Sequence, residues 1–428
     1  MINNLVLRFA PALRAIKYNL IGIKGRLQIA LRRRHKPSNN GTMVLLSLGG
    51  GKGSHFVASA VDEKGYDLYV VSEDFPMLES PYARGWIKHD PFGDYNTLKS
   101  AISRVKPIAV LVEQRNILLP VKAKLNSDLQ LVDYGLDSHK SSNSKIELRE
   151  AIDRANLPNI PWSLLERYDH KKLPFPFVLK PETGTGSRGI TIVESESDFE
   201  LAKKKLEKLK TDETVGGRVF LEQMIDGRQF DVEGVYLNEV CYPLSLTEEQ
   251  YDNIGKSLPS SWYLFSPPIG ESLTKKLFTA AEEFTRALGV KNGAFHCEMR
   301  MTNNQDIYVI DYSNRMGYPL MVSNCCGQSF PKAYVSVMGG NKPDVSRLEQ
   351  NSVFQKFARD EDELSRFKQL MKDHPSAVIQ KNMLGMYVAG VKTYARISTK
   401  TPTYAETYNL LKQYDLIPEQ WHSYYPNE

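Results

Sequence analysis

The chain has 428 residues, of which 41% are hydrophobic and 25% are charged. This length predicts two or three globular domains, and the lack of any run of 18 apolar residues argues against a membrane-spanning helix. Residues 1–40 hold nine Lys and Arg and no acid, which leaves 46 basic against 50 acidic residues in 41–428. Because this body is mildly acidic, we expect no specific nucleic-acid partner.

Residues 1–40 form a basic leader. The stretch LVLRFAPALRAIKYNLIGIKGRLQIALRRRHK mixes Leu, Ile and Phe with Lys and Arg at roughly helical spacing, broken by Pro11, Gly22 and Gly25. Acid-free, Arg-rich amphipathic segments are typical of helices on anionic membranes, of organelle presequences and of arms that bind polyanions. A helix packed on the body with a solvated basic face is an equal alternative. We therefore expect either peripheral contact with an anionic membrane through residues 1–40 or packing against the body.

An alternating strand and helix pattern begins at Thr42. Residues 43–46 are a continuous apolar run, as in a strand buried on both faces. Three more strand-like runs are DLYVVSED, PIAVLVEQ and LQLVDYG, and helical segments such as DYNTLKSAISRVK lie between them. This alternation predicts a doubly wound parallel sheet over residues 41–140.

The glycine-rich loop SLGGGKGSHF at 47–56 joins the first strand to a helix. As a P-loop it fails at both ends, because Leu46 stands where the first glycine is needed and Gly53 where Ser or Thr is needed. The G-x-G-x-x-G pattern fails as well, since Ser54 takes its third place. We expect the loop to turn the strand sharply into the helix, with amides that can meet a ligand at the helix N-terminus.

A second glycine-rich loop lies in PFPFVLKPETGTGSRGITIV and joins two predicted strands. Lys180 ends the first strand, where its ammonium can reach a phosphate. The loop backbone can fold over a charged group, and Ser187 and Arg188 add a hydroxyl and positive charge. A flexible hairpin tip is the alternative. The glycines of this loop are Gly184, Gly186 and Gly189.

Two carboxylates follow on neighbouring strands. VFLEQ and a run from Gln229 predict two strands, KKLFTAAEEFTRALGV predicts an amphipathic helix, and GAFHCEMRM and DIYVIDYSNRMG predict two strands near enough to pair. Glu298 and Asp311 interrupt these apolar strands, and with Asn314 they offer the oxygen ligands that Mg²⁺ prefers. Surface salt bridges are the alternative. The apolar helix face is Leu277, Ala281, Phe284 and Leu288.

In this order, Lys145, LKPETGTGSRG, FLEQMIDG, FHCEM and IDYSNRMG resemble the ATP-grasp superfamily, especially its carboxylate–amine ligases. The resemblance covers residues ~110–340. It implies an α/β fold of ATP-grasp architecture, with an N-terminal doubly wound parallel sheet and a two-lobed α+β ATP-binding region. The predicted segments are a leader at 1–40, an N-terminal domain at 41–140, an ATP-grasp domain at 141–345 and a C-terminal segment of unknown role at 346–428.

The resemblance assigns the ATP-binding residues. Lys145 and Lys180 match lysines that contact ATP, and the glycine-rich loop at 182–189 matches the flexible loop that closes over its phosphates. Glu222 through Ile225 match the hinge that contacts adenine through a carboxylate and backbone groups. One departure is that the ribose-binding acid of the family falls at Gln229, which can donate and accept hydrogen bonds but carries no charge.

The resemblance also assigns the metal ligands and a catalytic residue. Glu298 and Asp311 match the two acidic magnesium ligands, and Arg315 matches the arginine that holds the substrate carboxylate or acyl phosphate. The second acid of the family is usually Glu, with Asn two residues on. Here Asp311 is shorter, Ser313 holds the aligned place and Asn314 comes one residue later, so either of these two could complete the metal shell.

These matches imply an ADP-forming ligase that uses ATP and Mg²⁺, or Mn²⁺, to join a carboxylate to an amine of an amino acid or peptide-like substrate. A kinase on the same fold and a non-catalytic nucleotide-binding scaffold tethered by the leader are the alternatives. His296 shares the strand face of Glu298 and either contacts substrate or is a structural histidine. A cytoplasmic location is indicated by four cysteines without C-x-x-C or zinc spacing, namely Cys241, Cys297, Cys325 and Cys326.

Overall fold

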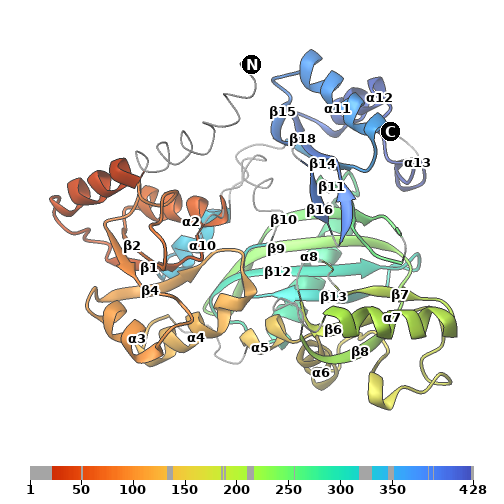
Figure 1. Ribbon diagram of the computed structural model, residues 1–428, viewed down its shortest axis with the longest axis horizontal. Coiled ribbons are helices and arrows are strands. Elements are labelled where there is room, and N and C mark those ends of the chain that lie inside the picture. The colour runs from red at the N-terminus through yellow and green to blue at the C-terminus, as the bar shows by residue number, and fades with distance from the viewer. Residues whose placement is uncertain are drawn as a thin grey trace, which may run out of the picture. The chain divides into compact units, whose positions relative to one another are not determined.

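The structure is a computed structural model that describes residues 22–49, 52–132, 138–184, 187, 189–209, 216–254, 256–317, 330–345, 351–383, 385–388 and 390–425. Backbone contacts divide the chain into two units (Figure 1). Unit 1 is Met1–Leu136 with Pro331–Asp344, and unit 2 is Asp137–Phe330 with Val345–Glu428. The four-segment division predicted from the sequence stays a prediction.

Unit 1 is built on a parallel sheet in the order β3-β2-β1-β4. Its central strand carries the apolar run at 43–46, and all four of these side chains are fully buried. Helices α3 and α4 lie on one side of the sheet and α2 and α10 on the other (Figure 1), so the doubly wound prediction is confirmed. The elements are β1 Thr42–Leu46, α2 Lys52–Glu63, β2 Asp67–Ser72, β3 Gly85–Lys88, α3 Tyr95–Ser103, β4 Pro107–Val112, η1 Asn116–Leu118, α4 Leu119–Asp128 and α10 Phe330–Met338.

One strand of unit 1 was predicted in the wrong place. The described part of LQLVDYG, residues 129–132, is not a strand. Leu129 ends α4 by donating its N–H to Leu125 O, and Gln130 has a left-handed φ of 54°, so the chain turns there. Leu129 and Leu131 pack half-buried against the core beside α4, which accounts for their apolar character. The fourth strand is instead β3, formed by the short run GWIK.

The described part of the leader packs against unit 1. Residues 22–33 are helical, and Arg32 forms two hydrogen bonds with the carboxylate of Asp62, at 2.5 and 2.9 Å. Ile29 is buried, and Arg84 donates to His35 O at 2.8 Å. Within the described residues, the helices are all too short or too polar to cross a bilayer.

Unit 2 contains an eight-stranded antiparallel sheet in the order β13-β12-β9-β10-β11-β14-β18-β15. Helix α8 (Glu271–Ala287) covers one face with the predicted apolar stripe, since Leu277, Ala281, Phe284 and Leu288 are all buried. The strands are β9 Arg228–Leu237, β10 Val240–Tyr251, β11 Ser260–Phe265, β12 Gly293–Met301, β13 Ile307–Ser313, β14 Ser352–Ala358, β15 Val378–Asn382 and β18 Ala395–Thr401.

A second, four-stranded antiparallel sheet in unit 2 has the order β5-β8-β6-β7. The predicted strands on either side of the second glycine-rich loop are confirmed as β6 (Phe177–Thr183) and β7 (Thr191–Val193). Helix α7 (Glu196–Leu209) packs Phe199, Ala202 and Leu206 against this sheet. The remaining elements here are α5 Ser138–Asn143, α6 Lys145–Arg154, β5 Trp162–Leu164, η2 Leu165–Arg167 and β8 Gly216–Gln223.

The C-terminal part of the chain completes the eight-stranded sheet. Strands β14, β15 and β18 extend it, and Trp262, Phe354 and Trp421 form the centre of their hydrophobic core. Arg228 at the start of β9 makes a bidentate ion pair with Glu248 at 2.8 and 2.9 Å. The remaining elements are α11 Glu361–Asp373, β16 Met386–Val388, β17 Val391–Thr393, α12 Tyr404–Gln413 and α13 Trp421–Tyr424.

Candidate functional site

The part of the eight-stranded sheet formed by β13, β12, β9 and β10 has one apolar and one polar face. Side chains alternate across a strand, so the even positions of β9 join the core beneath α8 while Gln229, Asp231 and Glu233 share the opposite face. Strand pairing then sets polar residues side by side in rows. One row runs Asp311, Glu298, Asp231 and Thr247 across β13, β12, β9 and β10. This row contains both predicted magnesium ligands.

Glu298 and Asp311 are direct cross-strand partners, as the sequence predicted for two facing carboxylates. Lys145, the first residue of α6, places its Nζ 2.8 Å from Asp311 Oδ2. Burial alone would raise the pKa of Asp311, but the Lys145 charge and hydrogen bond hold it below its usual value. The charge of Lys180 lowers this pKa further, so both predicted ATP lysines act on the same carboxylate.

The residues after Asp311 face several polar groups. Ser313 is the cross-strand partner of His296. The Asn314 backbone N–H donates to Ser142 Oγ at 2.8 Å and its side-chain amide donates to Ser138 Oγ, whereas its Oδ1 is buried without a hydrogen-bond partner in the described part of the chain. An amide oxygen without a hydrogen-bond partner is a ligand that suits a hard cation such as Mg²⁺. Both Ser313 and Asn314 therefore stay candidates for the metal shell.

Lys180 belongs to a fully buried ionic triad. Its Nζ pairs with Glu222, and Arg149 Nε donates to the other Glu222 oxygen at 2.6 Å. Burial alone would raise the pKa of Glu222, but the charges of Arg149 and Lys180 lower it below its usual value. Burial lowers the pKa of Lys180. The Glu222 carboxylate is thus held by two cations, and the adenine contact predicted for this segment stays a prediction.

The predicted hinge lies between β8 and β9. Ile225 O accepts a hydrogen bond from Arg300 Nη1 at 2.8 Å. Gly227 has a φ of 146°, and a Cβ there would lie 2.1 Å from Met301 O, so only glycine fits this close approach. Gln229, at the predicted ribose position, donates to Tyr251 Oη at 3.1 Å and faces Glu249 Oε2 at 3.4 Å.

Three members of the second glycine-rich loop are described. Gly184 follows β6, while Ser187 and Gly189 have positive φ values of 57° and 76°. Gly186 and Arg188 lie outside the described residues. Arg315, the predicted catalytic residue, donates from Nη1 to Met316 O at 3.0 Å. The roles assigned to these six residues stay predictions.

His296 lies between two carboxylates. Its Nε2 is 3.2 Å from Glu298 Oε1, and its Nδ1 is 3.4 Å from Glu233 Oε1. Burial alone would lower the pKa of His296, but its contacts with Glu233 and Glu298 outweigh burial and raise the pKa to about 10. Gly317 N donates to the same Glu233 oxygen at 2.8 Å. These contacts support a structural role for this histidine.

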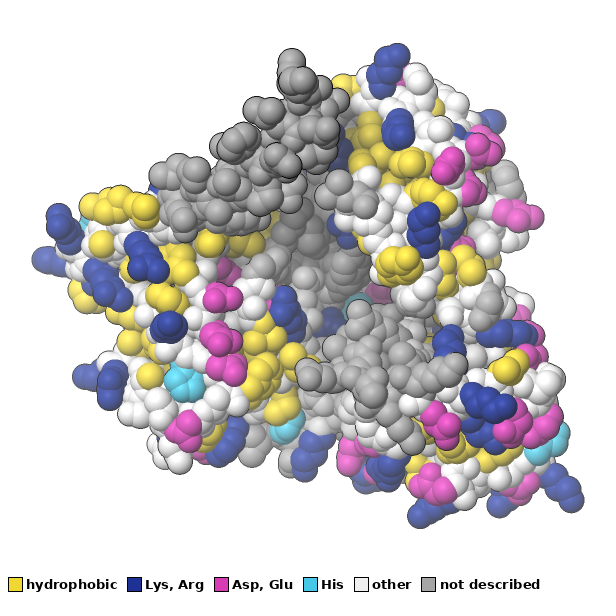
Figure 2. All heavy atoms as spheres, viewed as in Figure 1, with side chains coloured by type: hydrophobic (Ala, Val, Ile, Leu, Met, Phe, Trp, Pro, Cys, Tyr) yellow, Lys and Arg dark blue, Asp and Glu magenta, His cyan; other side chains and the backbone are white. Residues whose placement is uncertain are grey.

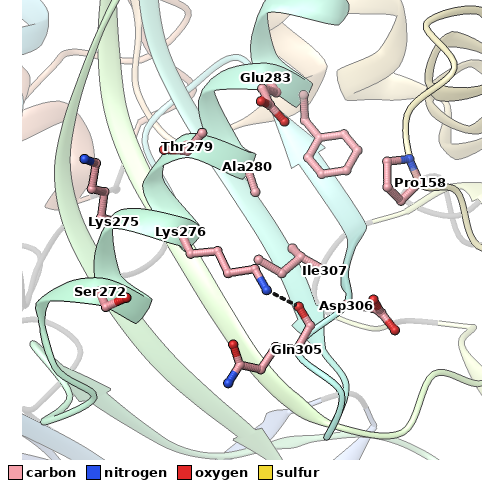
Figure 3. Close-up of a pocket in the computed structure, with 11 residues that line it drawn as sticks. Pro158, Ser272, Lys275, Lys276, Thr279, Ala280, Glu283, Gln305, Asp306 and Ile307 are labelled. Atoms are coloured by element: carbon pink, nitrogen blue, oxygen red, sulfur yellow. Dashed lines mark hydrogen bonds between the residues drawn. The ribbon is translucent and has the colours of Figure 1, made fainter.

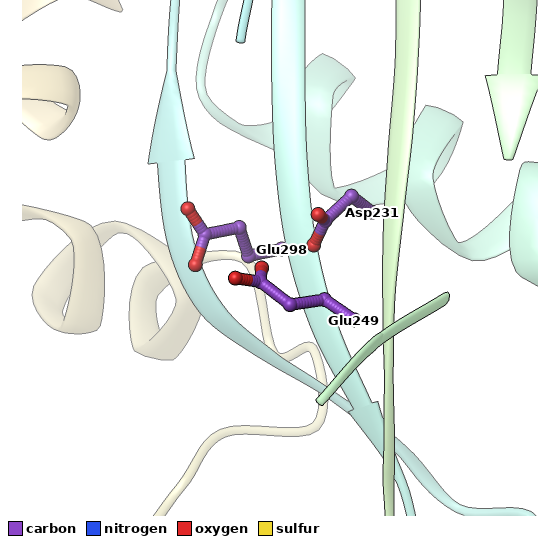
Figure 4. Close-up of side chains that lie close together, drawn as sticks. All are labelled: Asp231, Glu249 and Glu298. Atoms are coloured by element: carbon purple, nitrogen blue, oxygen red, sulfur yellow. The ribbon is translucent and has the colours of Figure 1, made fainter. Parts of the chain in front are cut away.

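An acidic cluster on this face was missed by the sequence analysis. Asp231 and Glu249 join Glu298, with one carboxylate oxygen from each within 4.8 Å of the others (Figure 4). Burial and the nearby Glu249 charge raise the pKa of Asp231 well above its usual value, while burial and Glu298 raise that of Glu249 to about 7. The sequence signal for this cluster was the alternation of side chains along the strand that includes Gln229. This alternation puts Asp231 on the same face as Gln229.

Arg149 is the other missed residue. It is four positions after Lys145 in α6, so both side chains leave the same side of this helix. Besides Glu222, it donates to Val309 O at 2.7 Å, and it thereby links β8 to β13. The available signal in the sequence was an arginine four residues after the lysine predicted to contact ATP. Arginines at this spacing are, however, common on solvated helix faces.

A cavity of about 520 Å³ lies elsewhere in unit 2, beside α8 and the turn before β13 (Figure 3). Lys275, Lys276 and Glu283 from the helix line it, together with Gln305 and Asp306 from the turn. Lys276 Nζ donates to Gln305 O at 2.7 Å across one end. The predicted site residues are not among those that line this cavity, so the chemistry is assigned to the polar sheet face.

Comparisons with known proteins relate part of this chain to ATP-grasp proteins. Residues 173–321 match the family model of an ATP-grasp domain. The alanine–anticapsin ligase of Bacillus subtilis is 19% identical over 287 residues, which is 61% of this chain and 60% of that protein. The D-alanine–D-alanine ligase of Geotalea uraniireducens is 26% identical over 182 residues, 41% of this chain and 56% of that protein. These matches cover less than two thirds of the length of either relative.

Solved structures share the fold at low sequence identity. The L-amino acid ligase from Bacillus licheniformis has a TM-score of 0.67 at 17% identity, covering 89% of this chain and 98% of that chain. N5-carboxyaminoimidazole synthetase from Staphylococcus aureus, complexed with ADP, has a TM-score of 0.67 at 14% identity with the same coverage. The predicted α/β fold of ATP-grasp architecture is confirmed, and residues 173–321 match an ATP-grasp domain.

Proposed function

We propose that this chain is an ATP- and Mg²⁺-dependent ligase that joins a carboxylate to an amine through an acyl phosphate. The observation that carries the proposal is the grouping of Lys145 and Lys180 around Asp311, which faces Glu298 across adjacent strands. Two cations can hold phosphate oxygens while two carboxylates hold the metal ion that accompanies ATP. The named activities of the ligases that resemble this chain support the same reaction class.

Each residue has a role in this proposal. Glu298 and Asp311 would hold Mg²⁺ together with Ser313 or Asn314, and the ion would neutralise charge on the transferring phosphoryl group. Lys145 and Lys180 bind phosphate oxygens, and the backbone amides at 184–189 cover them. Ile225 and its neighbours receive adenine, and Gln229 hydrogen-bonds the ribose.

The chemistry requires two steps. An oxygen of the substrate carboxylate attacks the γ-phosphorus of ATP, the bond to the β-phosphate oxygen breaks, and ADP leaves. The amine nitrogen then attacks the acyl carbon, the bond to the phosphate oxygen breaks, and inorganic phosphate and a proton are released. Arg315 holds the carboxylate in line with the phosphate and stabilises negative charge as the amine adds.

Hydroxylamine tests the acyl phosphate directly. The full chain with MgATP and a panel of amino acids and other carboxylic acids should release ADP, and hydroxylamine should convert the acyl phosphate to a hydroxamate. A kinase that phosphorylates a hydroxyl group would release ADP without hydroxamate and would retain phosphate on its product. A non-catalytic scaffold would bind ATP and release no ADP with any substrate, and either result would overturn the ligase assignment.

The substrate class proposed is an amino acid or peptide-like carboxylate with an amine acceptor. Several similar ligases are named for amino acid substrates, which supports this choice. Since the reaction consumes ATP, a cytoplasmic location fits it, as does the prediction of reduced cysteines. We expect no specific nucleic-acid partner, because the net charge of residues 41–428 is negative.

We also infer that the leader touches an anionic membrane surface. In the described leader helix, Ile23, Leu27 and Leu31 recur every four residues and are 57–59% exposed, so they form one apolar stripe. Figure 2 shows hydrophobic side chains mixed with Lys and Arg over this helix, which is red in Figure 1. An apolar stripe beside basic side chains is typical of helices that lie in the headgroup region. The contact of Arg32 with Asp62 leaves the side chains of this apolar stripe exposed.

A further inference from the structure

Three carboxylates on the polar sheet face converge at a place that the predicted magnesium pair does not explain. Asp231 is the direct cross-strand partner of Glu298, on the side opposite Asp311. Glu249 reaches the same place from the next strand, where it lies diagonal to Asp231. One oxygen from each carboxylate lies within 4.8 Å of the other two, and Figure 4 shows the three side chains close together on neighbouring strands. This spacing allows a single ion to touch all three.

Asp231 is the second, independent indication of a ligand. Its residue exposure is 1%, and neither carboxylate oxygen has a hydrogen-bond partner among the described residues. A buried carboxylate without donors is costly, because it loses its hydration and gains nothing in return. A bound cation would remove this cost.

The neighbouring cations form their hydrogen bonds and ion pairs with groups other than Asp231. Lys145 contacts Asp311 at 2.8 Å, and Arg300 donates from Nη1 to Ile225 O at 2.8 Å. His296 contacts Glu298 on the side shared with Glu233. Ser260 and Gln229 supply neutral donors to Glu249. The charge of His296 favours ionised Asp231, but Asp231 has no hydrogen bond among the described residues, and a bound cation would supply a direct contact.

We propose that Asp231, Glu249 and Glu298 form a divalent-cation site beside the Glu298 and Asp311 pair, and that this site fills before nucleotide binds. Three carboxylates are hard, anionic oxygen ligands, which suit Mg²⁺, Mn²⁺ or Ca²⁺ rather than a soft metal. Asp311 is not a member, because Lys145 already neutralises it in the absence of nucleotide. The site does not depend on the proposed ligase reaction, so ion binding and activity can fail separately.

Binding of Mn²⁺ to the metal-free, nucleotide-free full chain tests the proposal. The concentration of free Mn²⁺ is followed by electron paramagnetic resonance during titration, and melting temperature is recorded with Mn²⁺ and with EDTA. Asp231→Asn and Glu249→Gln should each weaken binding at least about tenfold, since each removes one charged ligand. Asp311→Asn should leave the affinity within about threefold. Glu283→Gln, an exposed carboxylate on α8, is the charge-matched control and should have no effect.

Each outcome of these measurements either supports or overturns the proposed cation site. Weaker binding in Asp231→Asn and Glu249→Gln alone supports the site, and Mn²⁺ should then raise the melting temperature of wild type more than that of either variant. Weakening by Asp311→Asn alone would place the ion on the predicted pair and overturn the proposal, as would no binding at millimolar Mn²⁺. In EDTA both variants should be at least as stable as wild type, because each replaces a carboxyl group whose charged form is disfavoured by burial; unfolding of both would also overturn the proposal.

Discussion

Lys145 and Asp311 lie 166 residues apart in the sequence, yet their side chains form a 2.8 Å ion pair in unit 2. The lysine thus neutralises a predicted magnesium ligand while it occupies a predicted ATP-binding position. Both partners of this pair are expected to change contacts on nucleotide binding, with Lys145 moving to a phosphate oxygen and Asp311 to the metal ion.

Lys145→Met is expected to have two opposite effects. Loss of a phosphate contact should lower kcat/KM for ATP at least about tenfold, equivalent to roughly 1.4 kcal/mol. Because Asp311 loses its competing cation, the Mg²⁺ concentration for half-maximal ATP turnover should fall. Steady-state ADP release measured against ATP and Mg²⁺ checks both, with the exposed Lys171→Met as control. An unchanged Mg²⁺ requirement would show that the ion pair does not compete with the metal.

The metal pair itself makes a stronger prediction. Glu298→Gln preserves size but removes the charge that faces Asp311, and it should lower ATP turnover at least about 100-fold, as loss of one preorganised electrostatic group does. Near-normal ADP production in Mg²⁺ would mean that this site is misassigned. Circular dichroism and thermal melting should show an intact fold, because the Glu298 side chain is partly solvent-exposed.

Strands β12 and β13 show how much of the candidate site could be predicted from the sequence. The strand-like runs of β12 and β13, together with their short connection, were enough to predict that Glu298 and Asp311 lie on neighbouring strands. The sequence could not show that Lys145 reaches Asp311 or that Glu249 approaches Asp231, because such contacts depend on strand order and on how helices pack. The periodicity within a single strand does not determine the order of the strands in the sheet.

In unit 1, the sequence alone could not show which short apolar runs form strands. LQLVDYG and GWIK both have apolar residues in strand-like runs, but the described residues 129–132 of the first are not a strand, whereas the second enters the sheet as β3. Leu129 and Leu131 are half-buried beside α4, and that packing satisfies their side chains without a strand. A run of this length can be buried in either way, so its partner decides the outcome.

The buried triad of Arg149, Glu222 and Lys180 predicts a dependence of stability on pH. The folded-state pKa of Glu222 is lowered, so its contribution to the free energy of unfolding is present above its ordinary value near 4.5 and is lost as pH falls through the lowered value. Glu222→Gln leaves two buried cations without a counter-charge and should cost about 3–5 kcal/mol at pH 7. Urea unfolding of both proteins from pH 7 to pH 3 checks this.

In that titration the difference between wild type and Glu222→Gln should shrink toward acid pH, because protonated Glu222 resembles glutamine. The exposed Glu239→Gln serves as the control and should follow wild type throughout. A difference that stays constant with pH would show that packing rather than charge accounts for the loss.

Amide hydrogen exchange should locate the nucleotide. If the second glycine-rich loop covers the ATP phosphates, exchange across 184–189 should slow when MgATP is added to the full chain. The loop after β1 provides an internal comparison, because it also joins a strand through glycines but lacks both nucleotide motifs. Protection at 49–54 with no change at 184–189 would move the nucleotide to unit 1.

The leader stripe makes the last prediction. Replacing Ile23, Leu27 and Leu31 together by Asn removes exposed apolar area without changing charge, so binding to phosphatidylserine vesicles should weaken markedly. Binding of wild type should also fall as salt rises above about 0.1 M, where exposed charges are screened over ~10 Å. Cosedimentation measures both effects, and Leu201→Asn, which alters an exposed leucine on α7, is the matched control. ATP-dependent ADP release should be unaffected, because the proposed catalytic residues lie beyond residue 140. Equal vesicle binding by wild type and the triple variant would restrict the leader to the contacts that Arg32 and Ile29 make with unit 1.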